Sequence, residues 1–347
     1  MLPGTFHVKL RQICLLVSVA VLILAGCASP ALTDPLATTQ DVQPATPTVE
    51  IPPTPTTAPG KIILVQPQPG QNSQYNEVKP QVEQLARESG LGFEEAGSFL
   101  AADIQPEWKI IILFETSEQL PEALSAHPDK QFLVFSTVAL GAGANLSVIQ
   151  LRPEMQAFTA GLVSVLAAPD WRAGGMFSPD EPLGSLMADA YQTGGKYFCG
   201  ICNSYFAPIT LFPITARVSA SSDSAAWQAS LEQFRQSIVY FVYISNESSS
   251  PELLADLASR QYLMAGANTP PDEIRGTWAA TIAFDLNGAL NEIWPAAVSG
   301  QGGSLVYAPI TLRDVNPALL STGRIRLVET AIAELDAGLV HPNYVAP

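Results

Sequence analysis

Two cysteines that lie close together in the sequence have the spacing of a reactive pair. Cys199 and Cys202 form a Cys-x-x-Cys unit, which can hold half of a zinc site, a redox-active thiol pair or a structural disulfide. The chain has four Cys and three His, and this unit has neither a second such pair nor a nearby His beside it. We therefore expect no metal site, and a disulfide between Cys199 and Cys202, with two free thiols as the alternative.

Acid–base and nucleophilic chemistry finds little support in the sequence. Asp180 and Glu181 are adjacent in a Pro-flanked turn, so their side chains are expected to diverge rather than act as a pair. His127 and His341 each precede a Pro and have no obvious partner. No Ser lies in a strand–turn–helix nucleophile elbow. We expect no catalytic residues and no cofactor, and we do not expect an enzyme.

A second group of residues could bind a small molecule without altering it. These polar or aromatic residues lie at or just after the ends of expected strands, where aromatic rings can stack on a ligand and amides or hydroxyls can hydrogen-bond to it. Four of them also have a purely structural interpretation: Asn76 could cap a helix, Asn268 could be an ordinary turn residue, and Phe114 and Tyr243 could belong to the core. The expected ligand-binding residues are Tyr75, Asn76, Phe114, Thr116, Tyr243 and Asn268.

The elements that must position these residues alternate between short apolar strands and amphipathic helices. Strands are expected at 61–66, 109–114, 132–135, 147–151, 172–177, 214–218, 238–244, 261–265, 278–284 and 304–310. Helices are expected at 75–88, 119–126, 153–167, 183–192, 224–234, 251–260, 286–298 and 324–337. Strands that are apolar on both faces and alternate with helices indicate parallel α/β sheets covered by helices.

So many strands exceed one comfortable sheet, which predicts two lobes with a ligand cleft between them. The first lobe is expected to comprise about 61–168 plus C-terminal helices at about 286–300 and 320–340. The second is expected to comprise about 169–285 plus a strand at about 303–312.

The first sixty residues have a different composition. Lys9 and Arg11 precede a thirteen-residue apolar run from Ile13 to Ala25, which is too short to span a bilayer and is typical of an export signal. The run leads into Leu24-Ala25-Gly26-Cys27, which resembles the lipobox of bacterial lipoproteins. This implies removal of residues 1–26 and attachment of acyl chains such as palmitate to Cys27. The segment 28–60 has eight Pro, eight Thr and no Lys or Arg, so we expect 27–60 to be a disordered tether.

Charge limits the possible partners. The chain has 17 Lys plus Arg against 32 Asp plus Glu, a formal charge of −15. A basic stripe that could neutralise phosphates is therefore missing, and we expect no nucleic-acid partner. The expected location is outside the cytoplasm, at the cell membrane and held there by lipid.

Several short motifs resemble the basic membrane lipoprotein family of ABC transporter substrate-binding proteins. The matches are 153–162 (PEMQAFTAGL) followed by 172–176 (RAGGM), Gln74-Tyr75-Asn76, and Ala265-Gly266-Ala267-Asn268. The resemblance implies a type I periplasmic-binding fold and a purine-nucleoside-receptor-like function. Three places depart from the family pattern: Gln71 and Asn72 stand where acidic residues are typical, Asn268 stands where an Asp is typical, and Ala283 and Phe284 stand where a basic residue is expected.

The sequence thus predicts a membrane-anchored binding protein. It would capture a small polar ligand, with a nucleoside as one candidate, in an interlobe cleft and present it to an ABC permease. The alternative is a sensor or interaction lipoprotein that uses the same fold but binds ligand poorly.

Overall fold

The computed structural model describes residues 60–67, 73–179, 184–218 and 224–343. The predicted signal segment, Cys27 and nearly all of the predicted tether lie outside the described residues. Within the described ranges, none of the helices combines the length and the apolar character that crossing a bilayer requires.

The first lobe is built on a six-stranded sheet in which every pairing is parallel. Alternate residues of its central strands pack on opposite faces, with Ile110 and Ile112 on one side and Ile111 and Leu113 on the other. The strand order is β13 (Leu305–Tyr307), β5 (Leu146–Gln150), β4 (Gln131–Ser136), β3 (Trp108–Phe114), β1 (Lys61–Val65) and β2 (Gly92–Ala96).

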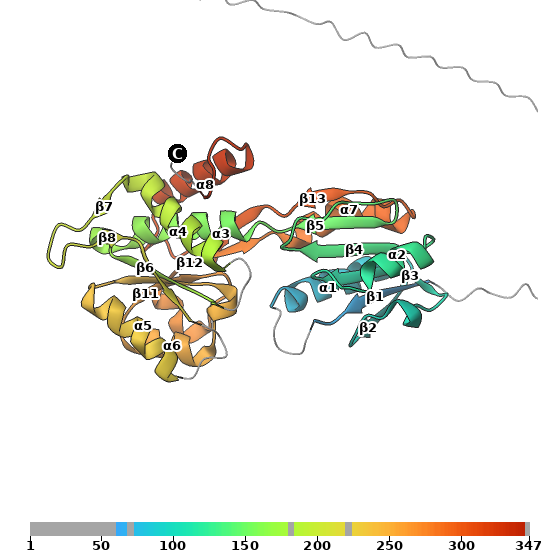
Figure 1. Cartoon of the computed structure of the whole chain (residues 1–347), viewed down its shortest axis with the longest axis horizontal. Coiled ribbons are helices and arrows are strands. Elements are labelled where there is room, and N and C mark those ends of the chain that lie inside the picture. Colours follow the sequence, from blue (N-terminus) through green and yellow to red (C-terminus); the bar gives the residue numbers. More distant parts are fainter. Residues whose placement is uncertain (1–59, 68–72, 180–183, 219–223, 344–347) are drawn as a thin grey trace, which may run out of the picture. The chain divides into compact units, whose positions relative to one another are not determined.

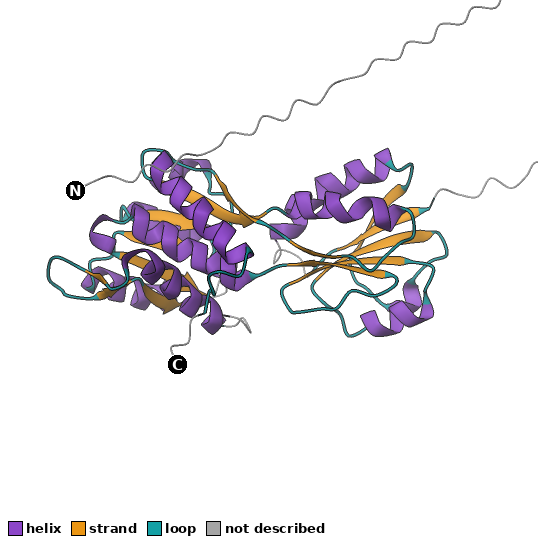
Figure 2. Ribbon diagram, turned by 90° about the horizontal axis from the view of Figure 1, so that it is seen from above, coloured by secondary structure: helices purple, strands orange, loops and turns teal. Residues whose placement is uncertain are grey.

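Three helices cover this sheet. One face is covered by α1 (Ser73–Glu88), through Val78 and Val82, and by α7 (Leu286–Val298). The opposite face is covered by α2 (Leu120–Ala126). Figure 2 shows helices on both sides of these strands. Both faces of the sheet are therefore shielded from water, which explains why the strand sequences are nearly continuous apolar runs.

The second lobe is built on another six-stranded sheet, parallel except at one edge, where β14 runs antiparallel to β12. Its strand order is β14 (Ile310–Arg313), β12 (Trp278–Phe284), β11 (Leu263–Gly266), β10 (Phe241–Ile244), β6 (Ala173–Phe177) and β9 (Ile214–Arg217). Figure 1 shows α3 (Pro153–Ala167) and α4 (Gly184–Cys199) on one side of this sheet, with α5 (Ser224–Gln236) and α6 (Pro251–Ser259) on the other. The last helix, α8 (Thr322–Asp336), packs against α3.

Helices α3 and α4 approach each other at two glycines. A Cβ atom added to Gly161 would lie 1.8 Å from the backbone oxygen of Tyr191, and one added to Gly194 would lie 1.9 Å from that of Phe158. Neither position has room for a side chain, so the two backbones are in direct contact. Because α3 is also covered by α8 and the sheet, nearly all of its residues are buried.

Over the described residues, the chain passes between the lobes three times. The crossings are Leu151–Arg152 between β5 and α3, Asp285 between β12 and α7, and Ala308–Pro309 between β13 and β14. Backbone hydrogen bonds join them: Ala308 N–H donates to Gln150 O (3.0 Å), and Asp285 N–H donates to Pro309 O (2.8 Å). The three crossing segments therefore form one connected bundle.

The expected α/β architecture with two sheets is confirmed, but the division of elements between the lobes differs from the expected one. Helix α3 was expected in the first lobe but packs against the second sheet. Helix α8 was also expected in the first lobe, and it packs against α3. The single expected strand at 304–310 is two strands, β13 in the first sheet and β14 in the second. Pro309 separates them, and Pro cannot donate a hydrogen bond to a sheet ladder.

Strand β2 and a short hairpin were not expected, and helix α4 is longer than expected. Strand β2 carries Glu94 and Glu95, so its sequence lacks an apolar run, and its edge position explains why charge is tolerated there. Helix α4 continues to Cys199, whereas the expected helix ended at residue 192. Gly194 and Gly195 lie in this additional part and are needed for close packing. A short hairpin follows, made of β7 (Cys202–Asn203) and β8 (Leu211–Phe212).

Candidate functional site

A cavity of about 420 Å³ lies between the two lobes, and we call it the cleft. Its volume is within the range of small-molecule sites. It is lined by residues of both lobes: Pro67, Ser73, Gln74, Glu77, Glu115, Thr137, Val138, Pro153, Gln156, Met187, Asn246, Glu247, Ala267, Asn268, Ala283, Phe284 and Leu286.

Most of the cleft wall comes from the carboxyl ends of parallel strands. In the first lobe, Glu115 directly follows β3 and Thr137 directly follows β4. In the second lobe, Asn246 and Glu247 follow β10, and Asn268 follows β11. Open parallel sheets place their ligand sites at this edge, because the loops there converge while the helices return along the faces.

The floor of the cleft includes Gln156, whose side chain is only 7% exposed. Its amide nitrogen donates to the backbone oxygen of Ile282 at 2.7 Å. Because a carbonyl can only accept, this bond fixes the orientation of the amide and leaves the Gln156 oxygen as a free acceptor. The described part of the chain supplies no donor to that oxygen.

The carboxylates of the cleft differ in their partners. Glu77 accepts a charged hydrogen bond from Arg313 at 2.6 Å, and Arg313 also donates to the backbone oxygen of Phe284 at 2.9 Å. Glu115 accepts a hydrogen bond from the Thr137 hydroxyl at 3.2 Å. One oxygen of Glu247 accepts from the Asn246 amide at 2.9 Å, and its other oxygen is buried with no donor among the described residues.

The environment of Glu115 raises the pKa of its carboxyl above the ordinary value. Loss of water against the cleft wall is the main cause, and the negative charge of Glu247 adds to it, while hydrogen bonds from Thr137 act in the opposite direction. Glu115 also has a φ of 67°, in the left-handed region that a side chain disfavours. The Glu115 backbone N–H donates a hydrogen bond to Phe135 O at 2.8 Å. Such strain is commonly found at functional positions.

Two polar contacts join the lobes beside the cleft. The Ser73 hydroxyl, at the start of α1, bonds the Asn246 side-chain oxygen at 2.8 Å. The Glu77–Arg313 ion pair links α1 to β14. Both contacts are side-chain contacts at the cleft rim; in the described part of the chain, main-chain connections between the lobes are found at the three crossings.

One of the six residues expected to bind ligand lines the cleft, namely Asn268. Asn76 and Thr116 are exposed on α1 and after β3, outside the cleft lining. The three expected aromatic residues, Tyr75, Phe114 and Tyr243, are buried in the core instead.

Tyr75 is held away from the cleft by its own contacts. Its hydroxyl donates to Glu95, and its ring meets Phe114 edge-on at 5.7 Å. Burial, followed by the bond to Glu95, raises the pKa of Tyr75 to about 12. Phe114 in turn stacks on Phe135 at 4.9 Å.

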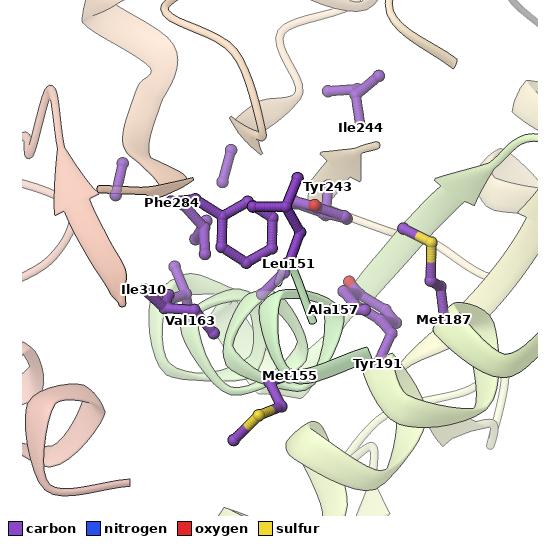
Figure 3. Packing of buried hydrophobic residues seen from close by; sticks show 14 of the residues in the cluster. Leu151, Met155, Ala157, Val163, Met187, Tyr191, Tyr243, Ile244, Phe284 and Ile310 are labelled. Carbon is purple, nitrogen blue, oxygen red and sulfur yellow. The ribbon is translucent and has the colours of Figure 1, made fainter. Parts of the chain in front are cut away.

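Tyr243 belongs to the apolar cluster around α3. Its ring stacks on Tyr191 at 5.8 Å and tilts against Phe177 at the same separation. Figure 3 shows Tyr191 and Tyr243 beside each other in this cluster. A strand-end aromatic was a reasonable candidate for ligand stacking, but here the side chain points to the helix-covered face of the sheet.

The acidic character of the cleft was not predicted from the sequence. Glu115 lies between two residues that were singled out, Phe114 and Thr116, and Glu247 lies shortly after Tyr243. The available signal was a carboxylate directly after a predicted buried strand. Gln156 was noted only as part of the family-like motif.

The Cys199–Cys202 pair lies apart from the cleft. The structure joins the two sulfurs as a disulfide, with Cα atoms 5.2 Å apart, within the usual range of bridged pairs. No cluster of three or more His, Cys, Asp or Glu that could hold a metal ion occurs among the residues that the structure describes.

No protein-family model and no curated protein sequence matches the chain. Solved structures do match it. A solute-binding protein of an ABC transporter system from Conexibacter woesei DSM 14684 is similar with a TM-score of 0.62 and 12% identity, over 82% of this chain and 98% of that one. Another from Aeropyrum pernix K1 is similar with a TM-score of 0.60 and 14% identity, over 83% and 94%.

The similar structures are not confined to transport proteins. A transcriptional activator from Bacillus halodurans has a TM-score of 0.60 and 12% identity, over 82% of this chain and 99% of that one. At such low identities the likeness shows the fold alone. Together with two parallel sheets and a cleft at their carboxyl ends, it shows that the chain has the two-lobed type I periplasmic-binding fold.

Proposed function

We propose that this chain is a membrane-anchored solute-binding lipoprotein of an ABC importer, of the basic membrane lipoprotein type. It captures a small polar solute between its lobes and presents the liganded form to a permease. The observation that carries the proposal is the cleft of about 420 Å³ lined by strand-end residues of both sheets. A ligand that touches both lobes stabilises their closed arrangement, and that arrangement is what a permease can recognise.

The lining of the cleft fits binding better than catalysis. Its described residues include Ser73 and Thr137 as hydroxyls, but no His, Lys or Cys that could activate either one. The Ser73 hydroxyl donates to the Asn246 amide oxygen, which is not a base, and the Thr137 hydroxyl donates to Glu115, a carboxylate that no third group among the described residues orients by a hydrogen bond. A nucleophile needs a base within hydrogen-bond reach, in an arrangement that a third group orients. We therefore infer that the solute leaves the cleft chemically unchanged.

The connections between the lobes suit hinge motion. Three short crossings join the lobes, and hydrogen bonds connect the crossings to one another. Rotation about such a bundle changes a few backbone dihedrals and leaves both cores intact. The rim contacts Ser73–Asn246 and Glu77–Arg313 are polar and accessible, so they can break and re-form at little cost.

The anchor is inferred from the sequence alone. Lys9, Arg11, the apolar run from Ile13 to Ala25 and the Leu24-Ala25-Gly26-Cys27 segment support export and lipid attachment at Cys27. Acyl chains each add about 0.8 kcal/mol of membrane binding per buried CH₂, so two or more hold the chain stably. The Pro/Thr-rich tether would then keep the two-lobed body outside the cytoplasm and near the permease.

Ligand binding can be tested with the full-length chain in detergent. Thermal unfolding would be followed against a panel of sugars, nucleosides, amino acids and amines, and each hit measured by calorimetry. A specific solute is expected to raise the melting temperature in a concentration-dependent way, because it binds the folded state alone. Failure of every solute to shift the transition would contradict transport and favour the sensor alternative.

Anchoring can be tested by growing cells with an alkyne-tagged palmitate. We expect label on the wild-type chain and none on Cys27→Ala, with the variant moving from the detergent phase to the aqueous phase. Cys202→Ala serves as the control, since it removes a cysteine far from the signal segment. Equal labelling of Cys27→Ala and wild type would refute lipid attachment at Cys27.

A ligand-poor sensor or interaction lipoprotein remains the second candidate, favoured by one observation. Ala283 and Phe284 line the cleft at the place where the family resemblance implies a basic residue. A purine would find no ammonium group there. Affinity capture that recovers a signalling partner and no permease would support this candidate.

A further inference from the structure

The charged residues in the described lining of the cleft are all acidic. Three glutamates line it, and Lys, Arg and His are missing from its described lining. The neighbouring segments outside the described residues, 68–72, 180–183 and 219–223, contain no Lys, Arg or His either. The whole chain has a formal charge of −15, which adds to the negative potential and favours the approach of cations.

Two of these three carboxylates lack a cationic partner. The charge of Glu77 is balanced by Arg313 at 2.6 Å. Among the described residues, Glu115 has only the hydroxyl and the backbone N–H of Thr137, and Glu247 has only the Asn246 amide, on one of its two oxygens. The other Glu247 oxygen is buried without a donor in the described part of the chain. A buried carboxylate oxygen without a donor is costly unless a ligand supplies one.

A second observation, independent of the glutamates, also points to a ligand that donates. The Gln156 side chain is more than nine-tenths buried and lines the cleft. Its nitrogen is used by Ile282 O, so its remaining group is an acceptor, the amide oxygen. An ammonium or guanidinium group carries several N–H donors and no acceptor, which matches this set.

The rest of the lining indicates that the cation is organic. A bare metal ion needs several oxygen or nitrogen ligands around it, and no such group of His, Cys, Asp or Glu occurs in the described ranges. The cavity of about 420 Å³ is also far larger than an ion. Part of its wall is apolar, which suits a carbon skeleton: Val138, Pro153, Met187, Ala283, Phe284 and Leu286.

We propose that the cleft binds a small organic cation with ammonium or guanidinium N–H groups, held between Glu115 of the first lobe and Glu247 of the second, with Gln156 accepting a further hydrogen bond. This inference rests on the proposed function, because it names the ligand class for the same cleft. The same arrangement links the charge of the ligand to closure of the two lobes. The two carboxylates repel each other when the cleft is empty, and a cation between them attracts both lobes at once.

The test uses calorimetry on the full-length chain with matched probes. The cationic probes are butylamine, putrescine and agmatine, and the neutral and anionic counterparts are butanol, butanediol and succinate. Ribose and adenosine test neutral solutes, choline tests a cation without N–H donors, and Ca²⁺ tests a metal. We expect at least one amine or guanidine to bind, with affinity that falls as salt is raised, and no binding of its neutral counterpart.

Variants then locate the charge. Glu115→Gln and Glu247→Gln are each expected to weaken binding of the cation about tenfold or more, since a charge-assisted hydrogen bond is lost. Glu122→Gln is the control, because it removes the same charge on the exposed surface of α2. It is expected to change affinity less than about twofold. Melting temperatures without ligand show that each variant is folded.

The outcomes separate this inference from the proposed function. Binding of ribose or adenosine with affinity that neither Gln variant alters would overturn the cation inference and leave solute binding standing. Binding of Ca²⁺ or choline in place of the amines would also overturn it. If no probe and no solute of the wider panel binds, both the inference and the proposed function fail.

Discussion

Glu115 and Glu247 line the same cleft from different sheets: Glu115 follows β3 of the first lobe, and Glu247 lies in the turn after β10 of the second. Neither has a cationic partner among the described residues, whereas Glu77 nearby is paired with Arg313. Each lobe therefore contributes one carboxylate without a cationic partner to the lining of the cleft.

The first prediction concerns pH. The pKa of Glu115 is raised by burial and by Glu247, so the native state holds this proton more tightly than the unfolded chain does. Stability therefore falls as pH rises from the ordinary glutamate pKa, about 4.3, through the raised native value. Glu115→Gln removes this titration, and we expect the variant to be more stable than wild type at about pH 7.5 and equal to it near pH 4.

Urea unfolding midpoints at both pH values would check this, with Glu122→Gln as the control. The same offset between Glu115→Gln and wild type at both pH values would contradict a raised pKa.

The second prediction compares two asparagines. Asn268 lines the cleft, while Asn76 is exposed on α1 outside it. For whichever solute binds, Asn268→Ala is expected to weaken affinity by about threefold to tenfold, the size of one lost hydrogen bond. Asn76→Ala is expected to leave the affinity unchanged. Calorimetric titrations of both variants decide the matter, and equal effects would show that Asn268 has no specific role.

The third prediction concerns Tyr75. Its hydroxyl donates to Glu95, which also accepts from Lys79 at 2.7 Å, and its ring is buried. Tyr75→Phe keeps the packing and deletes the hydrogen bonds of the hydroxyl with Glu95 and Gln66, so we expect a loss of about 1 kcal/mol or more in unfolding free energy. Ligand affinity should not change. A large loss of affinity with unchanged stability would instead make Tyr75 a ligand-contacting ring.

The fourth prediction tests the contact between α3 and α4. Gly161→Ala places a methyl group 1.8 Å from Tyr191 O, so one helix must move. We expect a loss of about 2 kcal/mol or more in unfolding free energy. Gly323→Ala in α8 is the matched control, since nothing lies within 4 Å of its added Cβ, and it is expected to be neutral or slightly stabilising. Chemical denaturation of both variants measures the difference, and equal stabilities would argue against a tight crossing.

The fifth prediction concerns Cys199 and Cys202. We expect that iodoacetamide in denaturant leaves both residues unmodified in the oxidised chain. After reduction, the peptide that contains them should take up two alkyl groups by mass spectrometry. Alkylation of both without reduction would identify them as free thiols.

Much of the fold was predictable because its signals are local. Buried parallel strands such as Trp108–Phe114 read as continuous apolar runs, and α3 begins at a Pro, which favours the first turn of a helix. Elements without such signals were missed. Strand β2 is half polar at a sheet edge, and the division between β13 and β14 depends on which sheet each strand joins, which is decided far away in the sequence.

The site was harder to predict than the fold. Strand ends were chosen as the place to look, and one of the residues chosen there, Asn268, lines the cleft. The chosen aromatic residues are buried outside the cleft lining, because the direction in which a ring such as Tyr243 points depends on strand register and helix cover rather than on residue type. Gln156 could not be identified from its own neighbourhood, since its role depends on Ile282, 126 residues later.

The pairing of β13 with β5 has a consequence for biosynthesis. Ser304 and Ser147 are in contact although they lie 157 positions apart in the sequence. The outer edge of β5 therefore has no partner strand until β13 has been synthesised. Parallel pairing over such a span is slow, and a bare edge invites strands of other molecules. Chaperones that shield the growing polypeptide should therefore matter most for the first lobe. Deletions near the C-terminus that remove β13 should cause the first lobe to aggregate, although most of that lobe comes from the N-terminal half of the chain.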